Sequence, residues 1–204
     1  MAGMALADLV ANRTMSAEMA ETLREAALAR RSYLVIALPR LAGKSTVLQA
    51  VLDVARQDGA PVRELGVDGT DVAALAREAR GGYLYVPEVS QQAVTEGYVW
   101  GPKVRQAFAA IAGGTALTAS LHADSVEDAI EIIRRNDVPD ADLARLEIVV
   151  HIRSLGEWEH PTRRVVAGVH ELVGVSGGEA RTRVLHRWDQ ARDRFEQVVS
   201  RGNF

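Results

Sequence analysis

Residues 38–45 (LPRLAGKS) combine a glycine, a lysine and a hydroxyl side chain in the order used to hold phosphate groups. The segment matches the second half of the phosphate-loop pattern G-x-x-x-x-G-K-[ST]. In such a loop Gly43 lets backbone amides approach a phosphate, Lys44 places an ammonium between the outer phosphates, and Ser45 ligates Mg²⁺. The competing interpretation is a Gly-Lys-Ser that stands by chance at the start of a helix.

The lysine content gives Lys44 a separate significance. Of 24 basic side chains only Lys44 and Lys103 are lysine, which leaves 22 arginines. A compact ammonium on a flexible stem suits a phosphate loop better than a planar guanidinium, so Lys44 has a physical reason to remain lysine. Lys103 follows Pro102 at an expected helix start and lacks such surroundings.

The loop departs from the full pattern at its beginning. Leu38 takes the place of the first glycine, and Pro39, Arg40 and Leu41 stand where these loops are commonly glycine-rich. Pro39 also removes one backbone amide that could bind a phosphate.

Two further side chains with chemical potential follow expected strands. Glu88 comes after residues 83–87, and His122 comes after residues 116–121. Ligands in open α/β sheets collect beyond the carboxyl ends of the strands, so this geometry would group both with the loop. Taken singly, Glu88 could be an ordinary loop acid and His122 a capping or core histidine.

The elements that must position these residues alternate between strand and helix. This alternation, with short loops, predicts an α/β fold with a mainly parallel central sheet and flanking helices. Two short helical pieces are expected in residues 4–31, strands at 33–38, 60–65, 83–87, 116–121 and 146–152, and helices at 44–58, 71–80, 102–111 and 125–135.

The last 50 residues have a different pattern. Residues 163–174 and 180–186 are expected to form antiparallel strands, with a polar tail after them. We therefore expect a helical lead-in at 1–31, a core at 32–155 and a small β-rich C-terminal segment at 156–204.

Composition excludes several classes of function. The chain of 204 residues contains no cysteine, which excludes disulfides, thiolate zinc sites and thiol nucleophiles. No apolar run approaches the roughly 18 residues of a membrane span, so no membrane insertion is expected, and the N-terminus lacks the basic region of a signal peptide. A net charge of −3, without a basic aromatic stretch, argues against nucleic acid as a partner.

Spacing along the whole chain carries a resemblance to a known family. Residues 42–48 (AGKSTVL) look like the end of its phosphate loop, residues 84–89 (LYVPEV) like its Walker B strand, and residues 116–125 (ALTASLHADS) like its His box. The sequence resembles the C-terminal, RecA-like ATPase domain of the type II/type IV secretion and type IV filament assembly superfamily. Residues 163–166, 170–174, 187–189 and 193–195 are similar to the closing segment of its tight-adherence pilus and archaeal flagellum branch.

The resemblance implies a P-loop NTPase that uses ATP and Mg²⁺. The nucleotide would be bound by Leu41, Ala42, Gly43, Lys44, Ser45 and Thr46. Ser45 and Glu88 would hold the metal, Glu88 through its water shell or by polarising the attacking water. His122 would sense or contact the γ-phosphate region.

It also implies partners and a location. The chain would form a homo-oligomer, as a hexameric ring in which a neighbour supplies an arginine, or a hetero-oligomer with a full-length motor. It would act in the cytoplasm, at the inner face of the cell membrane, on an inner-membrane platform protein.

Several departures keep a second function open. Pro87 replaces the glycine before the Walker B glutamate, Ser90 replaces an expected arginine, and no Glu-Asp pair stands near Glu64 or Asp68. The family's N-terminal domain, which supplies arginine fingers, is expected to be missing. The alternative is therefore a degenerate, non-hydrolysing nucleotide-binding or structural subunit that assembles with a full-length motor.

Overall fold

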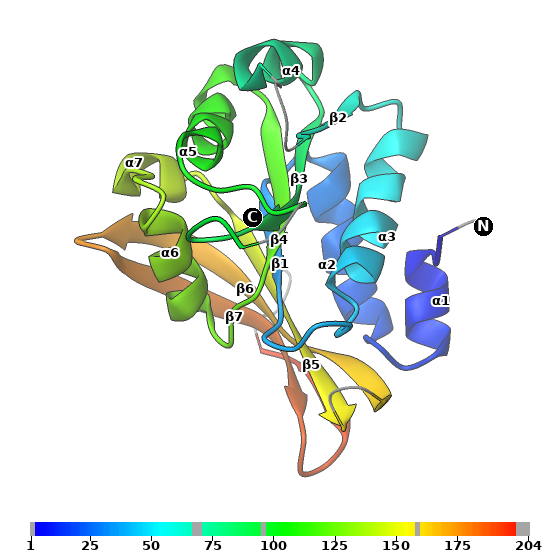
Figure 1. Cartoon of the computed structure of the whole chain (residues 1–204). Coiled ribbons are helices and arrows are strands. Elements are labelled where there is room, and N and C mark those ends of the chain that lie inside the picture. The colour runs from blue at the N-terminus through cyan, green and yellow to red at the C-terminus, as the bar shows by residue number, and fades with distance from the viewer. Residues whose placement is uncertain (1–2, 67–70, 95–96, 158–159, 199–204) are drawn as a thin grey trace.

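Within the part of the chain that the structure describes, eight strands form one mixed sheet. The computed structural model describes residues 3–66, 71–94, 97–157 and 160–198. The strand order is β2-β3-β4-β1-β5-β6-β7-β8, with the first five strands parallel and the last three antiparallel (Figure 1). The strands are β1 Tyr33–Ile36, β2 Val62–Glu64, β3 Tyr83–Val89, β4 Ala116–Leu121, β5 Ile148–Gly156, β6 Pro161–Ser176, β7 Glu179–Asp189 and β8 Arg194–Gln197. The expected α/β class with a mainly parallel core is confirmed.

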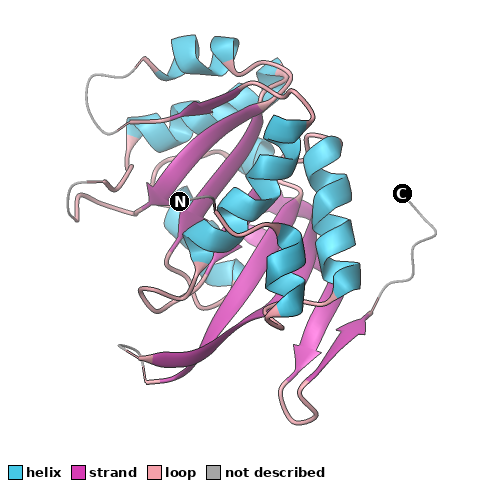
Figure 2. Cartoon of the chain, turned by 90° about the vertical axis from the view of Figure 1, so that its right-hand side faces the viewer, coloured by secondary structure: helices cyan, strands magenta, loops and turns pink. Residues whose placement is uncertain are grey.

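Helices cover both faces of this sheet, because its central strands are apolar on both sides. Tyr33 and Val35 of β1 belong to one hydrophobic core, and Leu34 and Ile36 belong to the other. The first core includes α1 Leu6–Ala11, α2 Ala17–Leu28 and α3 Lys44–Gln57, which lie in front of the sheet in Figure 2. The second includes α4 Val72–Glu78, α5 Pro102–Ala109, α6 Val126–Arg134 and the short α7 Asp140–Leu143.

The strand order brings three carboxyl ends together. β4 lies between β1 and β3, and all three are parallel. The loop after β1, the end of β3 and the residue after β4 therefore meet at one edge. Within β3 the pairing with β4 shifts between Val86 and Val89, where Pro87 cannot donate a backbone hydrogen bond. This irregularity redirects Glu88 at the end of its strand.

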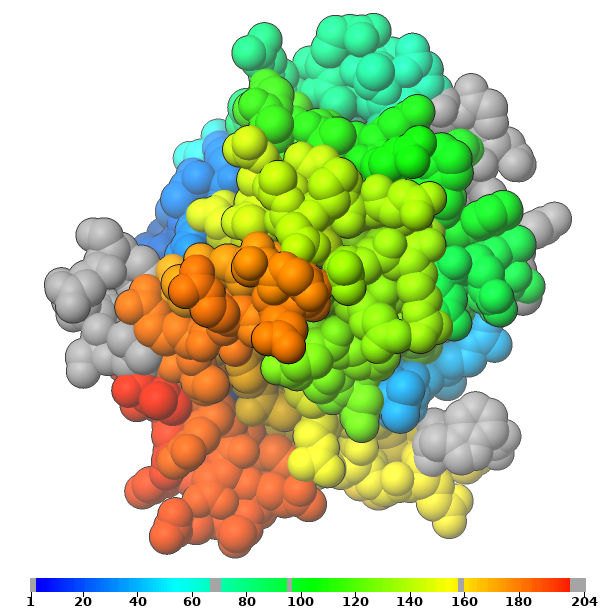
Figure 3. All heavy atoms as spheres, turned by 90° about the vertical axis from the view of Figure 1, so that its left-hand side faces the viewer, coloured from blue at the N-terminus to red at the C-terminus, as the bar shows by residue number. Residues whose placement is uncertain are grey.

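The C-terminal β-rich segment extends the same sheet. Gly177 and Gly178 both adopt positive φ at the turn between β6 and β7, a conformation that favours glycine. The Gly178 amide donates to Asp140 at the start of α7, 3.0 Å away, and the turn packs beside α6 and α7 (Figure 3). The prediction of a polar tail was wrong in part, because residues 194–197 form strand β8, which pairs with β7. Phe195 packs against the first core, which explains why this polar stretch forms a strand.

The N-terminal helices were predicted correctly. Ser16 caps α2 by accepting a hydrogen bond from the Met19 amide at 3.2 Å. Helix α7 was not expected, since four residues are too few to give a period. Across the described ranges, no helix is both long and apolar enough to cross a membrane.

Candidate functional site

The loop between β1 and α3 has an unusual backbone. Gly43, which precedes α3, has φ of 92°, and Leu41 has φ of 62°. A left-handed conformation costs a residue with a side chain about 1–2 kcal/mol, so Leu41 needs support from its surroundings. Arg164 on β6 gives that support, because its Nε donates to the Leu41 carbonyl at 2.7 Å. The loop is thus held by a residue 123 positions away in the sequence.

Helix α3 begins directly after this loop and presents its positive end to it. The first amides of a helix have no acceptor within the helix and carry a partial positive charge. Ser45 and Thr46, in this first turn, are exposed, whereas Lys44 is buried with 6% of its surface accessible. The helix start therefore offers free amides, two hydroxyls and one buried ammonium.

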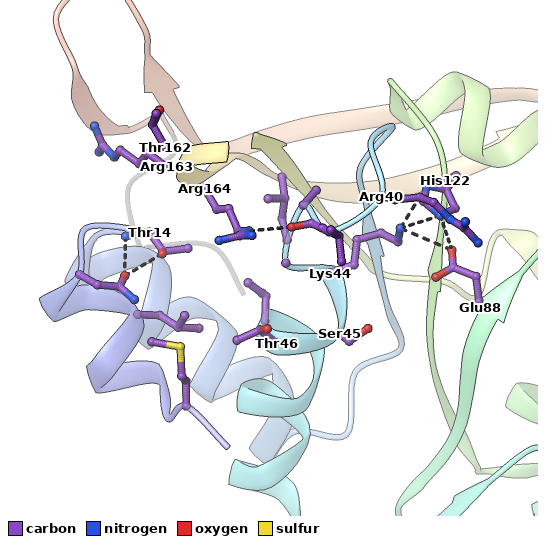
Figure 4. Close-up of a pocket in the computed structure, with 18 of the residues that line it drawn as sticks. Thr14, Arg40, Lys44, Ser45, Thr46, Glu88, His122, Thr162, Arg163 and Arg164 are labelled. Atoms are coloured by element: carbon purple, nitrogen blue, oxygen red, sulfur yellow. Dashed lines mark hydrogen bonds and ion pairs between the residues drawn. The ribbon is translucent and has the colours of Figure 1, made fainter. Parts of the chain in front are cut away.

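The Lys44 ammonium meets the two residues predicted from the strand ends. Its Nζ lies 3.6 Å from Glu88 Oε1 and 3.3 Å from each ring nitrogen of His122 (Figure 4). Burial lowers the pKa of Lys44, and the charge of Arg40 lowers it further, while Glu88 acts in the opposite direction. Glu88 thus offsets only part of the cost of burying the Lys44 ammonium.

Glu88 is oriented by the neighbouring strand. The Ser120 hydroxyl on β4 lies within hydrogen-bonding distance of the Pro87 carbonyl and 3.0 Å from Glu88 Oε2. The other carboxylate oxygen, Oε1, is buried and has no hydrogen-bond partner among the described residues. It faces Lys44 and retains an open acceptor position.

His122 is fixed on two sides. Its Nδ1 lies 2.9 Å from the Leu38 carbonyl oxygen, and its ring stacks on Tyr98 with centroids 6.4 Å apart. A carbonyl only accepts hydrogen bonds, so His122 is the donor in its contact with Leu38, through Nδ1. His122 therefore ties the loop after β1 to the end of β4.

These groups line one pocket of about 990 Å³, a size suited to a nucleotide-sized ligand. All eight predicted residues line it: Leu41, Ala42, Gly43, Lys44, Ser45, Thr46, Glu88 and His122. The pocket also includes residues outside the expected core. Its wall draws on the N-terminal segment (Met4, Leu9, Asn12 and Thr14) and on β6 (Thr162, Arg163 and Arg164).

Sequence reasoning missed several of these residues. Arg163 and Arg164 both line the pocket, but no pattern in the sequence assigned either of them to the site. Only their Arg-Arg adjacency was visible in the sequence. Tyr98 and Arg40 also line it; Arg40 could have been noticed from its place in the loop, but no pattern marked Tyr98.

The pocket is strongly cationic. Among the described residues that line it, four have basic side chains and one has an acidic side chain. The basic residues are Arg40, Lys44, Arg163 and Arg164, and the acidic residue is Glu88. Concave sites lined by one sign of charge concentrate ligands of the opposite sign. The arrangement therefore favours a polyanion at the start of α3.

Comparison with solved structures agrees with this architecture. The VirB11 ATPase of the Brucella suis type IV secretion system, solved in complex with sulphate, superposes with a TM-score of 0.55 and 17% sequence identity, over 80% of this chain and 54% of that one. The Yersinia pseudotuberculosis ATPase DotB gives a TM-score of 0.51 and 13% identity, over 83% of this chain and 48% of that one. The fold resembles that of the secretion ATPases.

The similarity covers only part of the matched structures. This chain spans about half the length of the structures that it matches. No protein-family model matches the sequence, and no curated protein matches it. The shared feature is the fold, over most of this chain.

Proposed function

We propose that this chain binds Mg-ATP in the pocket at the start of α3 and hydrolyses it. The observation that carries the proposal is the convergence of Lys44, Glu88 and His122 on the free amides of one helix N-terminus. The ends of β3 and β4 and the start of α3 supply these groups, and each is a group that phosphate chemistry uses.

The residues present fit the ligand. The α3 amides and the Lys44 ammonium are donors for phosphate oxygens, and the glycine at position 43 permits the close approach of the backbone. The Ser45 hydroxyl and the open Oε1 of Glu88 are the oxygen donors that Mg²⁺ prefers, directly or through water. Bound Mg²⁺ would neutralise charge on the outer phosphates.

Glu88 would act as the general base. Its carboxylate takes a proton from water as the water oxygen attacks the γ-phosphorus, and the bond to the bridging oxygen breaks with its electron pair left on ADP. ADP and inorganic phosphate are the products. Lys44 holds the outer phosphates, and His122 lies where it can contact the γ-phosphate region. Ser120 orients Glu88 for this role.

The biological role that we propose is that of a motor domain. The secretion-ATPase-like fold supports this role. The sequence resemblance to secretion and type IV filament assembly ATPases, and among these to the tight-adherence pilus and archaeal flagellum branch, supports it as well. In this role the chain works in the cytoplasm at the inner face of the membrane, on a platform protein. It would do so as a hexameric ring or together with a full-length motor.

A degenerate, non-hydrolysing subunit is the second candidate. One observation favours it: the loop lacks glycines at Leu38 and Leu41, and Leu41 is forced into a left-handed conformation. Against it, Pro39 does not reach the pocket wall, and Leu41 lines the pocket with 68% of its surface exposed. The loop therefore leaves the site open.

Nucleotide binding and phosphate release by the purified chain test the proposal. Lys44-dependent binding together with phosphate release supports the ATPase. Lys44-dependent binding with release at background, even with candidate partner proteins, supports the degenerate subunit. If neither ATP nor ADP binds, both nucleotide functions fail.

A further inference from the structure

Arg40 stands apart from the other cations of the pocket in what it contacts. Arg163 forms an ion pair with Asp193 at 2.7 Å, and Arg164 donates to the Leu41 carbonyl. Arg40 is exposed, lines the pocket, and has no ion pair or hydrogen bond among the described residues. Its guanidinium is thus available for a ligand.

Arg40 adds a second positive charge beside the Lys44 ammonium. Its charge acts on the buried Lys44 ammonium, to which it is repulsive. The carboxylate of Glu88 already serves Lys44, 3.6 Å away. Two cations therefore face one carboxylate, and an anionic ligand would relieve the repulsion.

The two arginines beside the loop lie on different sides of it. Figure 4 shows Arg40 on the side of Lys44, Glu88 and His122, and Arg164 on the side of Thr46. If a nucleotide lies along the loop with its reacting end at Glu88, Arg40 is at the terminal phosphate and Arg164 is nearer the inner phosphates and the sugar.

We propose that Arg40 binds the terminal phosphoryl group of ATP in cis. This inference rests on the proposed function. A guanidinium presents a planar fork of donors to phosphate oxygens, and such contacts are stronger than those between neutral groups. The chain then carries within its own loop an arginine that ring-forming ATPases can take from a neighbouring subunit.

A contact to the terminal phosphate predicts discrimination between ATP and ADP. ADP lacks the group that Arg40 would hold, so loss of the guanidinium weakens ATP binding and leaves ADP binding nearly unchanged. Loss of one charged hydrogen-bonding group corresponds to about a tenfold or greater loss of affinity.

The test is equilibrium binding of Mg-ATP and ADP to the wild-type chain and to Arg40→Ala, Arg40→Lys and Arg105→Ala. Arg105 is an exposed arginine on α5 outside the pocket and serves as the matched control. We expect Arg40→Ala to lower the ratio of ATP to ADP affinity about tenfold, Arg40→Lys to recover part of it, and Arg105→Ala to leave it unchanged. Circular dichroism confirms that each variant is folded.

Other outcomes overturn the inference in distinguishable ways. An unchanged affinity ratio in Arg40→Ala, with Lys44→Ala still abolishing ATP binding, overturns the role of Arg40 and leaves the proposed function standing. Equal weakening of ATP and ADP also overturns it, because the contact would then be to another part of the nucleotide. A wild-type chain that binds neither nucleotide overturns the proposed function and the inference together.

Discussion

Replacing Glu88 by glutamine removes a negative charge that lies 3.6 Å from the Lys44 ammonium. At this distance, with an effective dielectric constant of about 20, the attraction is about 4 to 5 kcal/mol. Water that re-enters the open pocket recovers much of this energy, so we expect the free energy of unfolding to fall by about 1–3 kcal/mol. For a chain of this size that loss lowers the Tm by roughly 3–10 °C.

The same substitution separates binding from hydrolysis. Without the Glu88 charge Lys44 is free to meet a phosphate, and the glutamine side chain keeps one oxygen that can face Mg²⁺, so Glu88→Gln should retain Mg-ATP binding. Glutamine cannot take a proton from water, so phosphate release should fall by about 10²–10⁴-fold. Calorimetric unfolding, equilibrium binding and a phosphate-release assay measure the three effects.

The control for Glu88→Gln is Glu78→Gln. Glu78 is an exposed acid on α4 that pairs with Arg63 at 2.9 Å, outside the pocket. We expect it to change stability by less than about 1 kcal/mol and to leave binding and turnover unaltered. Wild-type turnover in Glu88→Gln would refute the role of Glu88 as the base, and an unchanged Tm would refute its coupling to Lys44.

Three more predictions concern the loop, the histidine and the sheet. Gly43→Ala should lower the free energy of unfolding by about 1–2 kcal/mol and abolish ATP binding, because φ at this position is 92° and a Cβ would lie 3.0 Å from Arg164 Cδ. Thermal unfolding and a binding titration measure the two effects. His122→Ala should reduce phosphate release while ADP affinity stays unchanged, and a large loss of ADP affinity would contradict its placement at the terminal phosphate. Burial raises the pKa of Glu171, but hydrogen bonds from Arg183 and a second arginine outweigh it, so the pKa of Glu171 is lowered in the folded protein. Glu171→Gln should therefore lower the free energy of unfolding by about 1–2 kcal/mol at pH 7. This difference should shrink as the pH falls below about 4.3, because a carboxyl group with a lowered pKa stabilises the fold fully only above its pKa in the unfolded chain. Denaturant unfolding at several pH values checks this.

The sequence was sufficient to predict the sheet core because that core depends on local patterns. The run from Tyr33 to Ile36 is apolar at every position, which marks a strand buried on both faces. The rule that parallel strands bring their carboxyl ends to one edge then predicts that Glu88 and His122 lie beside Lys44. The predicted strand ended one residue before Glu88, whereas β3 continues to Val89 through the irregularity at Pro87.

The remainder of the site depends on contacts between distant parts of the chain. Arg164 reaches the Leu41 carbonyl from β6, and Tyr98 stacks on His122 from a segment without a regular pattern. Periodicity along the sequence carries no information on such contacts. The same holds for β8, whose polar residues form a strand only because β7 offers an edge and the core accepts Phe195.

The central claim is that Lys44 makes this pocket a nucleotide site, and one titration tests it directly. Mg-ATP is titrated into the wild-type chain, Lys44→Ala and Lys103→Ala, the last being the matched change at the other lysine of the sequence. We predict that the wild type and Lys103→Ala bind with equal affinity and that Lys44→Ala binds at least about tenfold more weakly while remaining folded. Equal ATP affinity in all three proteins, or no binding by the wild type, would contradict the claim.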